Sequence, residues 1–324
     1  MRQVILCVII ATGISLQTVY AQTYSGITVF GDSLSDTGNQ ATRFSERVLP
    51  PPYDEGRWSN GPVWVEYLAQ QLALPLPAAS TSGGTNYAWG GGTTGSIPGL
   101  GINIDMQVNT YLQDHTPGNA ELFVVLGGVN DSFLGQRNAS VAVDKLMESI
   151  SRLSDAGARH FLVSNLPEKV GIYQSLNDQL KVFVPSFNER LWSALDDLQA
   201  NSDGVSVHKV DFHRLYDDIV ADPNGFGFTD VTHPACVDCS RWDGNQLPPG
   251  YVFANVVPNP EQFYLWDDIH PSSAVHRLIS EAAYAAIVPE PSTEQSLAFA
   301  FFGLAVACRA AHNGVRRGTP ARRP

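Results

Sequence analysis

The sequence predicts an α/β fold in which helices cover both faces of a parallel β-sheet. Short apolar runs that suit buried strands alternate with longer segments whose apolar residues recur at helical spacing. Several of the apolar runs end in turns rich in glycine or asparagine. We find no internal repeat and no linker along this alternation, so we expect one domain.

The first expected element is a short buried strand formed by Ile27, Val29 and Phe30. It ends at Gly31-Asp32, two residues that permit a sharp turn and would expose the hydroxyl of Ser33. Open α/β sheets bind ligands at this carboxyl edge. Because a serine hydroxyl alone is a weak nucleophile, the interpretation requires a base, a group that orients the base, and donors for an oxyanion.

The other elements follow in regular alternation. We expect further strands at 85–88, 122–126, 161–164 and 205–210, and helices at 63–74, 141–153, 186–200 and 272–286. The strand at 122–126 ends at two glycines, and the strand at 161–164 ends at Asn165-Leu166-Pro167. Strands that alternate with helices in this way favour a parallel sheet.

The composition is that of an acidic globular protein. Of 324 residues, 44% are hydrophobic and 16% are charged, and the formal net charge is −12. Arg2 and the five arginines after Cys308 are six of the 20 basic residues, so the chain between them carries 14 basic against 32 acidic residues. Such a surface repels phosphate backbones, which argues against nucleic acid or a polyanionic substrate as partner.

Residues 1–21 have the pattern of a secretory signal. Arg2 is followed by an apolar stretch from Val4 to Ile10 and by a small-residue end at Ala21, after which we expect cleavage. The alternative is an N-terminal membrane anchor, although the apolar stretch is short for a span. Both interpretations predict export across the inner membrane.

Export decides how the cysteines are interpreted. Two of the four lie in the leader and in the C-terminal apolar run, which leaves Cys236 and Cys239 in a loop. A disulfide between them is expected in an oxidising compartment. A zinc site would need two more ligands, for which His233 and Asp238 are poor candidates, so we expect no metal. The loop also does not resemble the helix start of a thioredoxin-like redox pair.

A carboxylate precedes an imidazole by three residues in the run Trp266-Asp267-Asp268-Ile269-His270. If this segment turns, Asp267 can reach Nδ1 of His270 and orient it as a base. Asp268 is the adjacent alternative for the carboxylate. Taken alone, an Asp-x-x-His pair is more often a surface pair than a catalytic one.

Two further turns offer donors for an oxyanion. Asn86 leads into Gly90-Gly91-Gly92, whose backbone N–H groups no side chain obstructs, and Gly128-Val129-Asn130-Asp131 places an amide just beyond a strand. The alternative is that the glycines only make tight turns and that Asn130 or Asp131 caps a helix.

Together these four blocks resemble the GDSL, or SGNH, family of serine esterases and lipases. The resemblance implies that Ser33 is the nucleophile, that His270 is the base and that Asp267 orients it. It also implies an oxyanion hole formed by the backbone N–H groups of Ser33 and Gly91 and by the side-chain amide of Asn130. In the run of three glycines, the register of the oxyanion glycine could differ by one position.

The resemblance covers residues 24–288 and implies a hydrolase domain at 22–287. The family fold is a three-layer α/β/α sandwich with a flavodoxin-like parallel sheet, and its chemistry is ester hydrolysis without metal or cofactor. The segments 53–67 and 165–167 are similar to non-catalytic signatures of the lipase-like branch. Five apolar residues flank the catalytic blocks and either line an acyl pocket or pack in the core: Trp58, Trp89, Val129, Phe133 and Ile269.

Residues 288–324 resemble a PEP-CTERM sorting signal. A Pro-Glu-Pro motif at 289–291 precedes an apolar run at 297–308 and an arginine-rich end. The resemblance implies membrane contact through a transmembrane helix in this tail, processing by an exosortase-type enzyme, and delivery to the envelope or extracellular matrix of a Gram-negative bacterium. A plain C-terminal anchor is the alternative, and the apolar run is short for a full span.

Three functions remain open at this point. The first is a secreted or envelope ester hydrolase with a Ser-His-Asp triad, acting on lipid or small acyl esters. The second is an O-acetyl esterase acting on an exopolysaccharide, which only the sorting signal suggests. The third is a non-catalytic envelope or matrix protein on a hydrolase scaffold, and the complete set of catalytic positions argues against it.

Overall fold

A four-stranded parallel sheet forms the centre of the protein. The computed structural model describes residues 24–43, 49, 51–98, 101–239 and 255–288, so the expected leader and nearly all of the expected sorting signal lie outside the described residues. The strands are β1 (Gly26–Gly31), β2 (Glu121–Leu126), β3 (His160–Ser164) and β4 (Ser206–Val210), and they pair in this order. All three pairings are parallel, as the alternating pattern predicts.

Helices and a small second sheet complete the described fold. The α-helices are α1 (Asn39–Arg43), α2 (Trp64–Gln71), α3 (Ile104–Asp114), α4 (Val129–Phe133), α5 (Ala139–Asp155), α6 (Gln174–Asn201), α7 (Phe212–Ala221) and α8 (Ser273–Ile287). Short 3₁₀ helices lie at Ser80–Ser82, Asn224–Phe226 and Pro260–Gln262. The second sheet pairs β5 (Asp230–Pro234) with β6 (Phe263–Leu265) in parallel.

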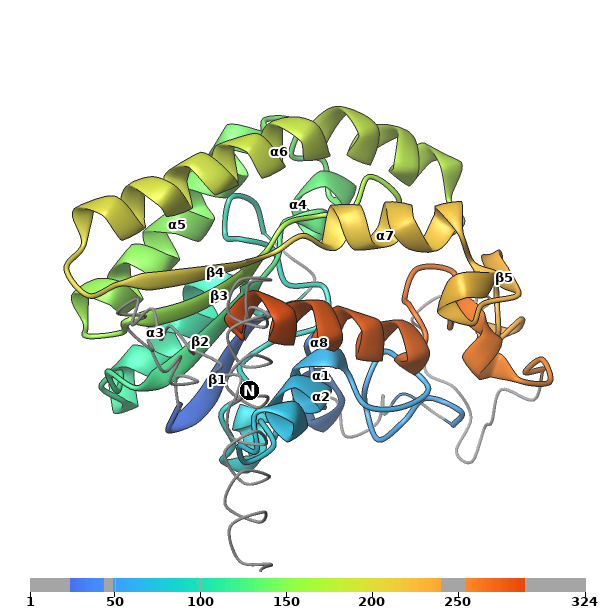
Figure 1. Cartoon of the computed structure of the whole chain (residues 1–324), viewed down its shortest axis with the longest axis horizontal. Coiled ribbons are helices and arrows are strands. Elements are labelled where there is room, and N and C mark those ends of the chain that lie inside the picture. Colours follow the sequence, from blue (N-terminus) through green and yellow to red (C-terminus); the bar gives the residue numbers. More distant parts are fainter. Residues whose placement is uncertain (1–23, 44–48, 50, 99–100, 240–254, 289–324) are drawn as a thin grey trace, which may run out of the picture.

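Alternate side chains of each strand point to opposite faces of the sheet, and each face has its own core. In β2, Leu122, Val124 and Leu126 pack in a cluster with residues of α2, α7 and α8. Phe123 and Val125 pack in the other cluster, with residues of α3, α5 and α6. The result is the three-layer α/β/α sandwich expected for the family, with α6 and α8 on opposite sides of the sheet (Figure 1).

The expected strand at 85–88 is not a full strand. It runs parallel to β1, and the N–H of Val29 donates to Thr85 while the N–H of Tyr87 donates to Val29. Within the described residues, Asn86 forms two isolated bridges, one with Val29 and one with Ala79. On the side away from β1, the carbonyl of Asn86 accepts the N–H of Ser80 and the side-chain amide of Asn39, both at 2.7 Å.

Five helices differ from the expectation, among them the short helices α1 and α4, which were not expected. Helix α6 begins at Gln174 rather than at 186, and Pro185 lies inside it on the exposed side, where the lost backbone N–H does not disturb the core. Helices α3 and α7 were not expected. Yet each buries residues at positions i, i+4 and i+7, and in α7 these are Phe212, Tyr216 and Ile219.

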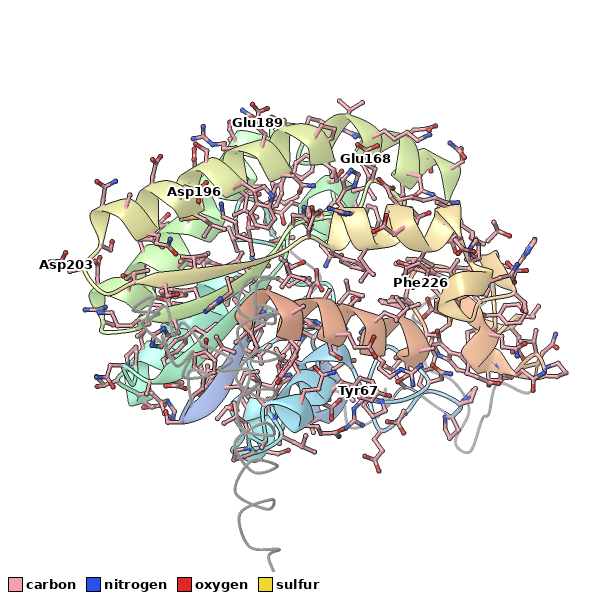
Figure 2. All side chains as sticks on the ribbon, viewed as in Figure 1. Tyr67, Glu168, Glu189, Asp196, Asp203 and Phe226 are labelled. Atoms are coloured by element: carbon pink, nitrogen blue, oxygen red, sulfur yellow. A yellow bond between two sulfur atoms is a disulfide. The ribbon has the colours of Figure 1, made fainter. Side chains whose placement is uncertain are left out.

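The outer side of α6 is acidic. Glu189 and Asp196 on this helix, and Asp203 just after it, are exposed (Figure 2), and Asp196 forms an ion pair with Lys209 of β4 at 2.6 Å. Within the part of the chain that the structure describes, no helix is long and apolar enough to cross a bilayer. The transmembrane helix expected in the tail lies outside those residues.

Candidate active site

Ser33 lies in a tight turn directly after β1. The backbone of Gly31 is held from both sides by Gln107, whose Oε1 accepts the Gly31 N–H at 2.9 Å while its Nε2 donates to the Gly31 carbonyl at 2.8 Å. A Cβ atom on Gly31 would lie 2.8 Å from the carbonyl oxygen of Leu126, so only glycine fits there. This packing places the partly exposed Ser33 at the carboxyl edge of the sheet.

Asp32 helps to form this turn. Its Oδ1 accepts the N–H of Leu34 at 3.0 Å, and its side chain is buried. Burial raises the pKa of Asp32 to about 7, although the Leu34 N–H and the charge of His270 act in the opposite direction.

Hydroxyl, imidazole and carboxylate form a continuous hydrogen-bonded chain. His270 Nε2 lies 3.0 Å from Ser33 Oγ, and His270 Nδ1 lies 3.0 and 2.9 Å from the two carboxylate oxygens of Asp267. Because an ionised carboxylate only accepts hydrogen bonds, Nδ1 carries the proton and Nε2 accepts from Ser33. This is the geometry that activation of a serine hydroxyl by a general base requires.

The carboxylate of Asp267 has further donors. Its Oδ1 accepts the backbone N–H groups of Ile269 and His270 at 2.8 and 2.7 Å, and its Oδ2 accepts the hydroxyl of Tyr53 at 2.6 Å. Burial alone would raise the pKa of Asp267. The charge of His270 and these hydrogen bonds outweigh burial, so the pKa lies below its ordinary value and the group stays ionised.

Asp268, the alternative carboxylate, does not reach the imidazole. Its Oδ2 accepts the hydroxyl of Tyr173 at 2.7 Å, and its carbonyl accepts the N–H of Ile172 at 2.9 Å. Among the described residues, Oδ1 of Asp268 has no hydrogen-bond partner. Burial and the nearby charge of Asp267 raise the pKa of Asp268, whereas the Tyr173 hydroxyl lowers it.

The three consecutive glycines have different environments. The N–H of Gly90 donates to Asp36 Oδ2 at 3.0 Å, and the N–H of Gly92 donates at 2.9 Å to a carbonyl in the same turn. Gly91 has a φ of +73° and lines the pocket, and its N–H makes no hydrogen bond within the described residues. Asn130 lies beside it and donates through Nδ2 to the carbonyl of Gly92 at 3.0 Å.

Two buried aspartates hold these donors in place. Asp36 accepts the N–H groups of Gly38 and Asn39 at the start of α1 as well as that of Gly90, which ties the glycine turn to the segment after Ser33. Asp131 accepts the N–H and hydroxyl of Thr94 at 2.9 and 2.7 Å. It does not simply cap a helix.

A cavity of about 220 Å³ opens at Ser33. Apolar side chains form much of its wall: Leu34, Trp58, Val129, Phe133, Val170 and Ile269. The ring of Trp58 lies 4.9 Å from that of His270, with an angle of 32° between the planes. Trp89, the fifth apolar residue considered from the sequence, does not line this cavity.

Cys236 and Cys239 are joined by a disulfide just after β5. The bond leaves no thiolate for zinc, and His233 instead contacts Asp230 at 2.9 Å. Among the described residues, no group of three His, Cys, Asp or Glu side chains is arranged to hold a metal ion.

Comparison with known proteins identifies the family. Residues 27–283 match the family model described as GDSL-like Lipase/Acylhydrolase. The chain therefore belongs to this family, and it is a hydrolase that acts on esters.

Individual relatives are distant. The chain is 28% identical to a thermolabile hemolysin of Vibrio parahaemolyticus over 79% of its own length, but it spans only 62% of the hemolysin. It is 27% identical to a phosphatidylcholine-sterol acyltransferase of Aeromonas hydrophila, with 87% of this chain and 96% of that protein covered. A crystal structure of a lipolytic G-D-S-L family protein from Veillonella parvula aligns with a TM-score of 0.45 at 15% identity, covering 80% and 95% of the two chains.

Proposed function

We propose that this protein is an exported carboxylic ester hydrolase that works through an acyl-enzyme on Ser33. One observation carries the proposal. The Ser33 hydroxyl is hydrogen-bonded to an imidazole that a buried, ionised carboxylate orients, and this hydroxyl lies at the mouth of an apolar cavity.

In the proposed reaction, His270 Nε2 removes the proton of Ser33 as Oγ attacks the ester carbonyl. Asp267 stabilises the imidazolium that forms, because its carboxylate already faces Nδ1. The C–O bond to the alcohol then breaks, and His270 returns the proton to the leaving oxygen. Water, deprotonated by the same base, attacks the acyl-enzyme and releases the carboxylic acid and Ser33.

The tetrahedral oxyanion would be held by three donors. The backbone N–H groups of Ser33 and Gly91 make no hydrogen bonds among the described residues, so they are available to a ligand. The amide of Asn130 has two N–H bonds, and the carbonyl of Gly92 takes one of them. The second N–H is left for the oxyanion. Gly91 is favoured over its two neighbours as the oxyanion donor. The N–H groups of Gly90 and Gly92 already make hydrogen bonds within the protein.

Lipid or other acyl esters are the substrates that the cavity suits best. Its wall is largely apolar, which favours an acyl chain of several carbons over a bare acetyl group. The name of the Aeromonas relative, which acts between phosphatidylcholine and sterol, supports a lipid ester as one class of substrate.

A series of p-nitrophenyl esters from acetate to palmitate tests the proposal. We expect kcat/KM to be higher for medium or long chains than for acetate, and we expect Ser33→Ala to fold normally and lose nearly all turnover. A marked preference for acetyl esters would instead favour the O-acetyl esterase alternative. Equal turnover by the Ser33→Ala variant and the wild type would reject the nucleophile, and no turnover by either would favour a non-catalytic scaffold.

We also propose that the chain is exported and sorted through its ends. The sequence patterns of residues 1–21 and 288–324 support a secretory signal and an exosortase-type processing step, with delivery to the envelope or matrix of a Gram-negative bacterium. Mass spectrometry of the mature protein tests this, because cleavage after Ala21 and near 289–291 should remove both ends. An intact arginine-rich tail would indicate a plain anchor.

A further inference from the structure

The carboxylate of Asp267 receives one hydrogen bond from a distant part of the chain. Its Oδ1 is held by the backbone N–H groups of Ile269 and His270, which belong to the same turn. Its Oδ2 accepts the hydroxyl of Tyr53 at 2.6 Å across 214 positions in the sequence. Among the described residues, every other donor to this carboxylate lies within the turn 267–270.

This distribution of donors leaves Oδ2 dependent on Tyr53. Without the phenolic hydroxyl, the one group in the described part of the chain that would still hold Oδ2 is Nδ1 of His270, 2.9 Å away, which is the atom that the carboxylate has to orient. The hydroxyl of Tyr53 therefore holds Oδ2 of Asp267 in place independently of the imidazole. A base that must rotate little during two proton transfers benefits from such a fixed partner.

The ring of Tyr53 is held by aromatic packing. It lies edge-on to Trp266, with centroids 5.9 Å apart and planes at 86°, and edge-on to Trp58 at 6.1 Å and 75°. Trp58 in turn packs against the imidazole of His270. Tyr53 is buried, so its hydroxyl has little freedom to leave the carboxylate.

The loop that carries Tyr53 is docked on the segment after His270. The hydroxyl of Ser59 donates to the carbonyl of Pro271 at 3.2 Å, and Oδ1 of Asn60 accepts the N–H of Ser273 at 2.8 Å. The two segments thus form one unit, and the distance between the phenol and the carboxylate is set by these contacts rather than by side-chain flexibility.

The electrostatics favour a neutral donor next to an ionised acceptor. Burial, and then the charge of Asp267, raise the pKa of Tyr53 well above its usual range, so the phenol keeps its proton. The same hydrogen bond contributes to the lowered pKa of Asp267.

We propose that Tyr53 is a positioning residue for the reaction, and that its hydroxyl fixes the carboxylate of Asp267 against His270. The inference rests on the proposed function, since it assigns Tyr53 a role through Asp267. Tyr53 does not line the cavity and has no contact with a bound ester in this account.

The test compares Tyr53→Phe with Tyr173→Phe. The first removes the hydroxyl on Asp267 and keeps the ring; the second removes the equivalent hydroxyl on the adjacent Asp268. We expect Tyr53→Phe to lower kcat by about 10-fold to 100-fold, the range for one hydrogen bond to a charged group, with KM changed less than about 2-fold. Tyr173→Phe should change kcat less than about 2-fold.

A double-mutant cycle separates positioning from a structural role. In an Asp267→Asn background, Tyr53→Phe should cost almost nothing more, because the carboxylate that it acts through is gone. Three results would overturn the inference. The first is a double variant in which the two losses of kcat multiply, and the second is an unchanged kcat in Tyr53→Phe. The third is a rise in KM in Tyr53→Phe that is as large as the fall in kcat. Thermal unfolding of each variant shows whether the fold is retained.

The two proposals fail differently. If Ser33→Ala is inactive but Tyr53→Phe is as active as the wild type, the role of Tyr53 is wrong and the proposed function stands. If turnover does not depend on Ser33, the proposed function is wrong, and the role of Tyr53 falls with it.

Discussion

Asp267 and Asp268 are adjacent buried carboxylates, and a tyrosine donates to each of them, yet their surroundings shift their pKa values in opposite directions. The pKa of Asp267 is lowered despite full burial, because the imidazole of His270 and several N–H and O–H groups favour its charged form. The pKa of Asp268 is raised, because burial and the nearby charge of Asp267 outweigh the one hydrogen bond from the hydroxyl of Tyr173. Burial acts on both carboxylates, and only around Asp267 do the hydrogen-bond donors and the imidazole outweigh it.

The two residues also contact different segments of the chain. Asp267 faces the imidazole, whereas the backbone carbonyl of Asp268 accepts the N–H of Ile172 and its side chain holds Tyr173. These contacts fix the segment just after Val170, which lines the cavity. One carboxylate thus faces the imidazole, and its neighbour joins this turn to the segment at 172–173.

The largest expected effect comes from substituting Asp267, and the same substitution of Asp268 is its control. Asp267→Asn should lower kcat by about 10⁴-fold, because an amide can donate to Nδ1 and favour the wrong tautomer of His270. Asp268→Asn should change kcat less than about 3-fold, since that side chain does not contact the imidazole. Steady-state kinetics on one ester measure both variants. Similar losses in the two would show that the carboxylates share the role.

A second pair of neighbours gives the next largest effect. Asn130 faces the cavity, while Asp131 is buried and binds Thr94. Asn130→Ala should lower kcat by about 10²-fold to 10³-fold with little change in KM, because the lost donor acts on the transition state. Its melting temperature should stay near that of the wild type, whereas Asp131→Ala should be clearly destabilised. A fall in melting temperature for Asn130→Ala that matches the loss of activity would contradict an oxyanion role.

The smallest effect concerns stability and pH. Because the pKa of folded Asp268 is raised, the folded state binds its proton more tightly than the unfolded chain does. The stabilisation is complete below the unfolded pKa, near 4, and is lost as pH rises through the folded pKa. Asp268→Asn removes this group, so as pH rises above about 4 the free energy of unfolding should fall less in the variant than in the wild type.

Urea unfolding at several pH values measures this difference. Asp32 and Asp36, whose pKa values burial also raises, to about 7 and about 6, are present in both proteins, so their contributions cancel in the comparison. A stability difference that is constant with pH would mean that the environment of Asp268 does not shift its ionisation.

Much of the fold and of the candidate site could be predicted from the sequence, because both are encoded locally. The alternation of apolar runs predicted β1 to β4 and their parallel pairing, and short motifs brought Ser33, Asp267 and His270 to notice. In each motif the residues that matter lie within a few positions of one another. The turn 267–270 is such a case, since Asp267 reaches its imidazole three residues away.

What the sequence did not reveal depends on contacts between distant segments. The bond from Tyr53 to Asp267 spans 214 positions, and no periodic pattern marks it. Asp36 and Asp131 hold the glycine turn in the same way, through backbone groups far along the chain. Helix α7, in contrast, is encoded locally, in the helical spacing of Phe212, Tyr216 and Ile219.

Covalent labelling of the purified protein with a fluorophosphonate tests the central claim most directly. The account predicts one adduct, located by peptide mass spectrometry on Ser33, and a labelling rate that falls sharply in His270→Ala because the base is missing. An adduct on another serine, or undiminished labelling of the Ser33→Ala variant, would contradict it.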